Sequence, residues 1–222
     1  ELYELVSYSS LSYIQKFKDN GFGIGIISSD DKDSIYQETE IMLAYSRQIV
    51  QNLNFGANIR YLSSYAYFDN VKFGSGKGIA VDLGSQYLLQ NKGLSFGLAL
   101  HSPIGIVFYE RKPLLGYDEE KYSQITDFYY NIGASFDLSE KFPALNRLLL
   151  VGELSDGYPC FGGEWTYADM LSIRSGLRFG NSLNRALTMG LGFKLSMIKL
   201  DYAYVSSPVN ADISQVSVSI NW

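Results

Sequence analysis

The sequence predicts an all-β protein, a transmembrane antiparallel up-and-down β-barrel of about fourteen strands, of which about thirteen can be traced in this chain. Three observations lead to this prediction. Apolar and polar residues alternate with a period of two along most of the 222 residues, and the connections between the alternating segments are short at one end and mostly long at the other. The chain also stops inside such a segment, on Trp222. Outer-membrane barrels alternate lipid-facing and lumen-facing residues and have short periplasmic turns with longer outer loops.

The composition allows a barrel and argues against membrane helices. Hydrophobic residues make up 46% of the chain and the mean hydropathy is −0.03, and no stretch approaches the ~18 apolar residues that a membrane helix needs. A barrel strand needs no such stretch, because every second residue can be polar. The 18 Tyr, 13 Phe and 21 Gly suit aromatic girdles and small lumen-facing positions. We expect a single barrel domain over residues 1–222.

The charge and the cysteine content exclude several other classes. A net charge of −5 and a pI near 4.9 argue against nucleic acid as a partner. The one cysteine, Cys160, cannot form an internal disulfide, and a lone cysteine is most often a small core residue. No secretion signal is visible at the start of the chain.

The period-two segments define the predicted strands. Along 189–195, Met189, Leu191 and Phe193 alternate with Gly190 and Gly192, whereas a helix would repeat its apolar residues every three to four positions. Thirteen such segments are found, at 5–17, 20–29, 37–49, 52–66, 76–89, 93–103, 127–139, 147–155, 158–167, 170–180, 186–196, 198–206 and 213–222.

Charged residues occupy the parity of these strands that is predicted to face the lumen. On the lipid face each would cost up to about 2–4 kcal/mol near the midplane, so the bilayer alone requires this placement. Two interpretations remain open: a polar conduit or ligand site, and a salt-bridged, solvated barrel interior. The predicted lumen-lining residues are Arg60, Asp82, Glu164, Arg174, Arg178, Lys194, Lys199 and Asp201.

The connections give the predicted orientation. Counting back from the end, one set is short, as at 168–170 and 51–52, and the other is mostly longer, as at 67–75 and 104–126. A bacterial outer-membrane location follows, with a periplasmic C-terminus and extracellular long loops. Single-chain bacterial barrels usually have an even number of strands, so we expect that an N-terminal piece with at least one strand precedes this chain.

The segment 104–126 is the longest predicted outer loop, and it carries apolar residues. Apolar side chains on a loop in water suggest a partner or an apolar ligand. The alternatives are a strand that extends above the membrane and a loop that folds into the barrel mouth. The candidate binding residues are Ile106, Phe108, Tyr109, Leu114 and Leu115.

No active site can be recognised, and we expect no enzymatic activity, no cofactor and no metal. His101 is the only histidine, and catalytic triads and histidine metal sites need partners for it. In a regular strand His101 and Ser102 would lie on opposite faces. The glycine-rich segment 74–78 lacks the spacing of a phosphate-binding loop.

Four stretches resemble the PorV/PorQ family of outer-membrane proteins, a branch of the FadL-like barrels: "GIAVDLGSQY" (78–87), "GLSFGLAL" (93–100), "GGEWTYADMLSIRSGLRFG" (162–180) and "MGLGFKLSMIKLDYAYVSS" (189–207). The resemblance implies fourteen strands. Members of the family begin with a small-residue segment containing Asn-Pro-Ala, which forms part of a plug, and nothing here matches it.

The resemblance implies two functions. A PorV-like protein would act as a binding or adaptor component of type IX protein secretion or surface assembly, within a larger complex. A FadL-like protein would transport hydrophobic small molecules passively. In either case outer-membrane lipid is a partner. By the same resemblance Val218, Ile220 and Trp222, at the end of the last strand, would form the signal that the barrel-assembly machinery reads.

Overall fold

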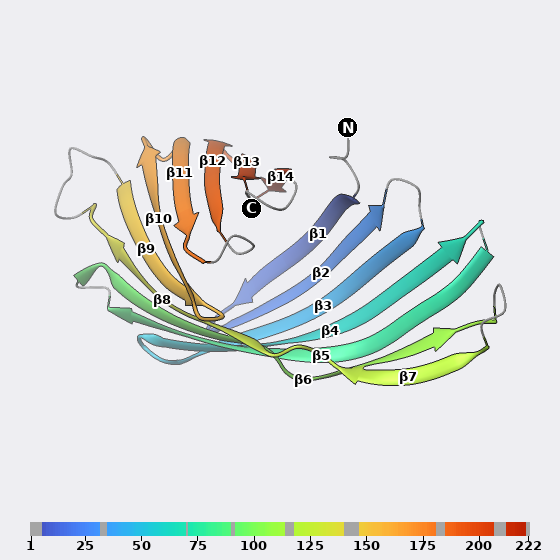
Figure 1. Ribbon diagram of the computed structural model, residues 1–222. Helices are drawn as coiled ribbons and strands as arrows, with labels where there is room; N and C mark the ends of the chain where they lie inside the picture. Colours follow the sequence, from blue (N-terminus) through green and yellow to red (C-terminus); the bar gives the residue numbers. More distant parts are fainter. Residues whose placement is uncertain are drawn as a thin grey trace. The chain divides into compact units, whose positions relative to one another are not determined.

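The computed structural model shows an all-β chain in which consecutive strands form antiparallel hairpins (Figure 1). No helix in the part of the chain that the structure describes is long and apolar enough to cross a membrane. The structure describes residues 6–31, 35–69, 71–89, 92–113, 118–139, 147–180, 185–206 and 212–220.

Fourteen strands are formed by these residues. The first seven are β1 (Val6–Phe17), β2 (Asn20–Asp31), β3 (Tyr36–Val50), β4 (Leu53–Phe68), β5 (Val71–Leu89), β6 (Leu94–Arg111) and β7 (Glu120–Ile125). The others are β8 (Tyr129–Asp137), β9 (Arg147–Ser155), β10 (Tyr158–Tyr167), β11 (Leu171–Arg178), β12 (Ala186–Leu195), β13 (Ile198–Ser206) and β14 (Ile213–Ile220).

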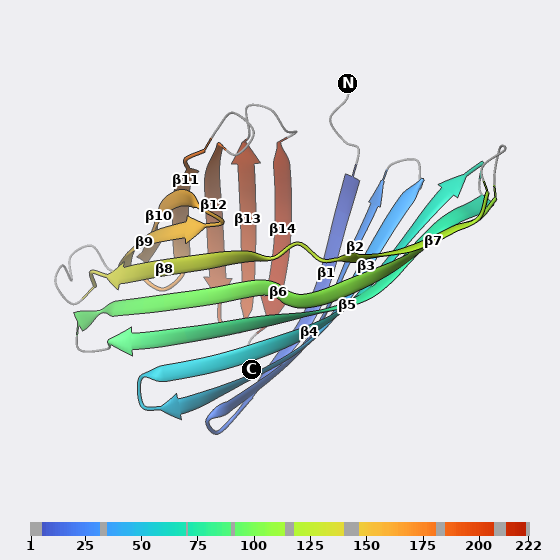
Figure 2. The ribbon, with the colours of Figure 1, turned by 60° about the horizontal axis from the view of Figure 1, so that its bottom comes forward.

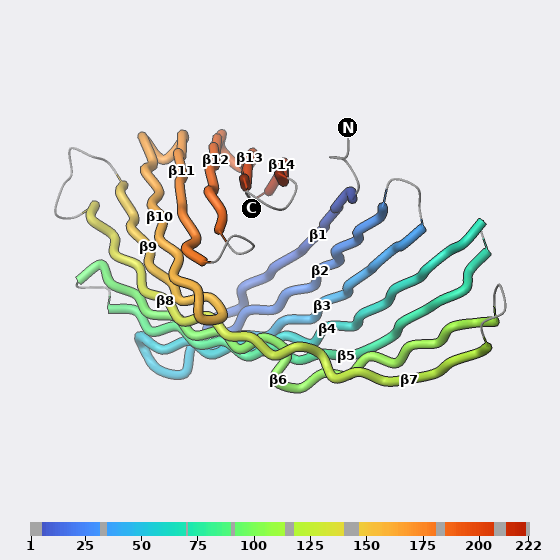
Figure 3. Tube along the Cα trace, in the orientation of Figure 1, coloured from blue at the N-terminus to red at the C-terminus, as the bar shows by residue number. Residues whose placement is uncertain are grey.

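The strand order confirms the predicted fold class. Neighbouring strands pair in chain order from β1 to β6 and from β8 to β14, with β6 next to β8, and β7 pairs with β6 off this path. The series of hydrogen-bonded strands from β1 to β14, with β7 left out, corresponds to the thirteen segments predicted from the alternation. β7 is the additional strand, and it lies inside the segment that was predicted to be the longest loop. Figure 3 follows the successive hairpins along the Cα trace.

The chain divides into two compact units. Unit 1 comprises residues 1–85 and 99–130, and it contains β1 to β4, most of β5, the C-terminal part of β6, and β7. Unit 2 comprises residues 86–98 and 131–222, and it contains β9 to β14. In unit 2 the strands β11 to β14 lie side by side (Figure 2).

Burial in both units is opposite to that of a protein that folds around an apolar core. Among the described residues, the buried apolar side chains are Ala80 and Val107 alone, whereas Ser102, Ser155, Thr166 and Ser172 are all buried. Large apolar side chains are instead exposed along one face of the strands, as Leu191 is by 53% and Val216 by 73%. We call this the apolar face and the opposite side the polar face.

Strand register explains how one face becomes uniformly apolar. β12 pairs with β13 so that Leu191 lies opposite Tyr202 and Phe193 opposite Leu200, all on the apolar face. The residues between them, such as Gly192 opposite Asp201, fall on the polar face. Since the side-chain period is two, a slip of one residue would exchange the faces, so the separation of apolar from polar side chains specifies the register.

Tight turns close several hairpins at the predicted short connections. The turn residues Lys18, Ala168, Asp169 and Ser196 have positive φ angles between 51° and 55°, the left-handed conformation that lets two antiparallel strands join within two or three residues. The short predicted connection at 155–159 is also a two-residue turn, formed by Asp156 and Gly157.

Two of the predicted long connections, at 67–75 and 104–126, are shorter than expected because the strands themselves extend. β4 and β5 run for 16 and 19 residues and leave only residues 69 and 70 between them, where a loop over 67–75 was predicted. β6 runs for 18 residues to Arg111. Placing Ile106, Phe108 and Tyr109 in a loop was therefore wrong, and the alternative of an extended strand is what the structure shows.

Three predicted residues lie outside the described part of the chain. Leu114, Leu115 and Trp222 fall there, so their binding and assembly roles stay predictions. Val218 and Ile220 are exposed by 64% and 60% on the apolar face of β14, where their role in barrel assembly also stays a prediction.

A lysine on the apolar face should destabilise the fold in lipid. We expect Val216→Lys, near the middle of β14, to lower the free energy of unfolding in phosphatidylcholine vesicles by about 2–4 kcal/mol, because a charged group enters the bilayer there. Urea unfolding followed by tryptophan fluorescence measures it. The control is Gln215→Lys, one residue earlier on the polar face, and equal losses for the two variants would contradict the assignment of faces.

Candidate functional site

The polar face of unit 1 carries a cluster of ionised residues centred on Arg60 of β4. Two of its guanidinium nitrogens, Nε and Nη2, lie 2.8 and 3.0 Å from the two carboxylate oxygens of Asp82 on β5. A third, Nη1, lies 3.4 Å from Oε2 of Glu40 on β3. The side chains of Arg60 and Asp82 are only 16% and 14% exposed, so this bidentate pair is largely shielded from solvent. The three residues come from the adjacent strands β3, β4 and β5.

An irregularity in β6 adds two more side chains to this cluster. Ser102 has a φ of 52°, and the local turn of the backbone directs its amide to Asp82, at 3.0 Å, and its hydroxyl oxygen to Arg60 Nη2, at 2.6 Å. The preceding residue, His101, has its Nδ1 3.9 Å from Asp82 Oδ1. The expectation that His101 and Ser102 lie on opposite faces was therefore wrong, because it assumed a regular strand.

This arrangement brings serine, histidine and aspartate together. The Ser102 oxygen accepts a hydrogen bond from Arg60, and the imidazole of His101 stacks on the ring of Tyr129 with centroids 4.4 Å apart. A hydrolytic relay would instead need a histidine nitrogen at hydrogen-bond distance from the serine oxygen. The expected absence of catalysis stays a prediction.

Unit 2 carries a second cluster, centred on Arg174 of β11. Its Nε donates to Glu164 Oε2 on β10, and its Nη1 donates to Asp201 Oδ1 on β13 at 2.6 Å. Lys199 Nζ lies 3.0 Å from the other oxygen of Asp201. The two cations and two carboxylates balance, so the cluster has no net charge. Thr166 extends it by donating to Glu164 Oε1 at 3.2 Å.

Two glycines of β12 make the reach of Arg174 possible. Arg174 and Asp201 lie on strands that are not neighbours, because β12 runs between them. A Cβ atom at Gly192 would lie 2.7 Å from Asp201 Oδ1 and 3.2 Å from Arg174 Nη1, and one at Gly190 would lie 3.4 Å from Arg174 Cβ. The guanidinium group thus occupies the space that side chains at these positions would fill. Sequence reasoning missed this role, although two glycines at successive polar-face positions were a usable signal.

The remaining predicted lumen residues are less closely partnered. Arg178 Nη2 donates to Ser155 Oγ at 3.1 Å, and Lys194, which lies opposite Lys199, makes no ion pair within the described residues. Both side chains are exposed. No group of three or more His, Cys, Asp or Glu among the described residues is placed to hold a metal ion. The absence of a metal and of a cofactor stays a prediction.

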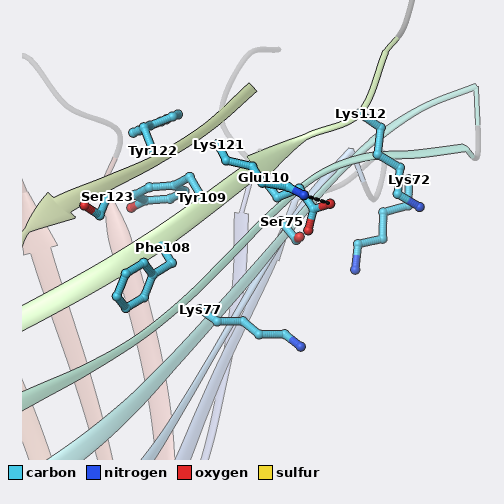
Figure 4. Close-up of a pocket in the computed structure, with 10 residues that line it drawn as sticks. All are labelled: Lys72, Ser75, Lys77, Phe108, Tyr109, Glu110, Lys112, Lys121, Tyr122 and Ser123. Carbon is cyan, nitrogen blue, oxygen red and sulfur yellow. Dashed lines mark ion pairs between the residues drawn. The ribbon is translucent and has the colours of Figure 1, made fainter. Parts of the chain in front are cut away.

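The predicted binding residues of β6 form a hairpin with β7 in unit 1. Ile106 lies opposite Ile125, Phe108 opposite Ser123, and Tyr109 opposite Tyr122, on whose ring it stacks at 5.0 Å. Phe108 and Tyr109 line an open groove with a volume of about 750 Å³ (Figure 4).

The chain is similar in structure to a known transport protein. No protein-family model matches the sequence, and no curated protein matches it. Among solved structures, the toluene transporter TodX of Pseudomonas putida superimposes with a TM-score of 0.61 at 12% sequence identity, over 90% of this chain and 81% of that one. At this identity the likeness concerns the fold alone, an antiparallel up-and-down β-barrel.

The Arg174 cluster should contribute measurably to stability. We expect Arg174→Ala to lower the free energy of unfolding in lipid vesicles by about 1–3 kcal/mol, because Glu164 and Asp201 lose a charged donor in a partly buried site. Urea titration measures the loss. Arg178→Ala, four residues further along the same face of β11, is the control and should cost less than about 1 kcal/mol, because only one hydrogen bond, donated to the neutral hydroxyl of Ser155, is lost. A reversed order would contradict the importance of the cluster.

Proposed function

We propose that this chain forms an outer-membrane β-barrel through which apolar or amphipathic small molecules pass by passive diffusion. The inverted burial carries the proposal, because charged residues gather on one face while large apolar residues stay exposed on the other. Such a chain finds a suitable solvent for its apolar face only in a bilayer, and an outer-membrane barrel is the β structure that satisfies all backbone hydrogen bonds there. The fold likeness to a toluene transporter supports the transport function.

The polar face has the features of a path for weakly polar solutes. Its arginines at positions 60 and 174 are neutralised by neighbouring carboxylates, so they do not present isolated charges to a passing molecule. Elsewhere on the polar face of unit 2 the side chains are small: Ser95 bonds Ser135 at 2.6 Å, and no heavy atom lies within 4 Å of the Cβ position of Gly97. A path that is neutral and sterically open would not exclude an apolar solute by desolvation or by size.

The orientation follows from the connections and belongs to the same proposal. The C-terminus would be periplasmic, and the extended ends of β4, β5 and β6 would project to the outside. The secretion-adaptor function of PorV-like proteins has no specific observation in its favour, so it stays a prediction and transport is the better-supported function.

Reconstitution tests the proposal directly. We expect vesicles with a lipopolysaccharide outer leaflet, which slows apolar solutes, to take up toluene faster with the folded protein than without it, and to show no swelling with a sugar such as arabinose. Uptake can be followed by an environment-sensitive dye inside the vesicle. Equal rates with and without protein would overturn transport, and rapid sugar entry would indicate a general porin instead.

A pair of adjacent substitutions tests whether the polar face lines the path. Gly97→Trp would place an indole in open space on the polar face of β6, and we expect it to slow uptake at least several-fold. Leu98→Trp is the matched control, because Leu98 is 39% exposed on the apolar face and an indole there would lie in lipid. The path would lie elsewhere if both variants transported like the parent.

A further inference from the structure

The apolar face of the β5–β6–β7 sheet in unit 1 changes abruptly from apolar to basic. Strand pairing places Ile106 opposite Ile125, Phe108 opposite Ser123, and Glu110 opposite Lys121. On the polar face, a Cβ atom at Gly78 would meet Val107, and one at Gly76 would meet the ring of Tyr109. The intervening residues on the apolar face therefore lie side by side as well, Ile79 next to Ile106 and Lys77 next to Phe108.

The transition occurs where these strands would leave the bilayer. β5 and β6 contain 19 and 18 residues, whereas a strand needs only about 9–11 to cross a membrane. Counting about ten residues from the end at which β5 and β6 are joined reaches Ala80 and Ile104. The exposed row of Ile79, Ile106 and Ile125 thus lies at the edge of the hydrocarbon region, and the groove beyond it lies at the level of lipid head groups.

The side chains that line this groove carry a net positive charge, although the chain is acidic. Four of the eleven lysines line it, against the single carboxylate of Glu110, whereas the whole chain has a net charge of −5. In Figure 4 the four lysines lie to the right of Phe108, Tyr109 and Tyr122. The residues that line the groove are Lys72, Ser75, Lys77, Phe108, Tyr109, Glu110, Lys112, Lys121, Tyr122 and Ser123.

The lysines differ in how fully they are engaged. Lys121 Nζ lies 2.7 Å from Glu119 and 3.6 Å from Glu110, and its hydrogen bond lowers the pKa of Glu119 below the ordinary value. The ammonium of Lys72 lies 3.8 Å from the centroid of the Tyr65 ring. Lys77 and Lys112 form no ion pair within the described residues, so their charges remain available to an anion from outside.

We propose that this groove binds the phosphate groups of an anionic lipid of the outer leaflet, with its acyl chains against Phe108 and the isoleucine row. The proposal rests on the membrane placement given under the proposed function. A lipid phosphate fits because the groove offers ammonium and hydroxyl donors directly above an apolar surface. A transported solute would follow the polar face instead.

Lipid titration of the folded protein tests this inference. Protein in neutral detergent micelles is titrated with lipid A, a bis-phosphorylated glycolipid, and the midpoint of thermal unfolding is recorded. We expect saturable stabilisation that Lys77→Gln combined with Lys112→Gln weakens about 30-fold in apparent affinity, at about 1 kcal/mol per lysine. The control is Lys16→Gln with Lys18→Gln at the opposite end of unit 1's hairpins, which removes the same charge and should leave the affinity unchanged.

Two results would overturn the proposal. One is equal weakening by the two double variants, which would mean that net charge alone governs binding. The other is saturation by inorganic phosphate at the same concentration as by lipid A, which would make the groove a site for free anions. Toluene uptake by the same samples reports on transport separately. Intact, groove-dependent lipid binding in a protein without uptake would support the present inference and contradict the proposed transport alone.

Discussion

The period-two alternation of apolar and polar side chains is the constraint on which the rest of this structure depends. The backbone N–H and C=O groups of each strand bond to the neighbouring strands. The side chains alone therefore decide which face of the sheet is compatible with lipid and which with water. Exposure of large apolar residues such as Leu191 and Val216 is unfavourable in water but favourable in lipid. The same alternation confines charges to the opposite face, where Arg60 and Arg174 find carboxylates on nearby strands. Fold stability and the chemistry of the polar face are therefore two consequences of one pattern.

The two clusters compensate the partly buried charge of their arginine in different ways. In unit 1 the residues come from adjacent strands, and the unusual backbone conformation of Ser102 adds an amide and a hydroxyl to the Arg60–Asp82 pair. In unit 2 Arg174 spans a whole strand, because Gly190 and Gly192 leave its path clear. Both arrangements give the arginine hydrogen bonds to two carboxylates, which reduces the cost of removing it from water. A face lined in this way consists of polar side chains but presents almost no uncompensated charge to a passing solute, in keeping with the proposed transport.

The basic groove of β5 to β7 extends the same reasoning to the boundary of the membrane. A transmembrane strand ends its apolar alternation where the hydrocarbon ends, and the residues just beyond face head groups instead of acyl chains. On β5 the apolar face changes from isoleucine to lysine between two successive positions of that face, Ile79 and Lys77. The groove is thus a local reversal of charge on an acidic chain, placed where an anionic lipid would meet it.

The sequence by itself determined the strands, their faces and their antiparallel order, because a side-chain period of two is a local property that survives in any environment. The thirteen strands of the hydrogen-bonded path and the fold class followed from it, as did the positions of the charged residues. The tertiary structure alone decided which charges meet: Arg174 with Asp201 across a strand, and Ser102 with Arg60 against the expected parity. It also converted most of the predicted loop at 104–126 into a strand hairpin, β6 with β7. These features depend on register, on a single left-handed residue and on glycines that matter for the space they leave, and none of these can be read from the alternation of one strand.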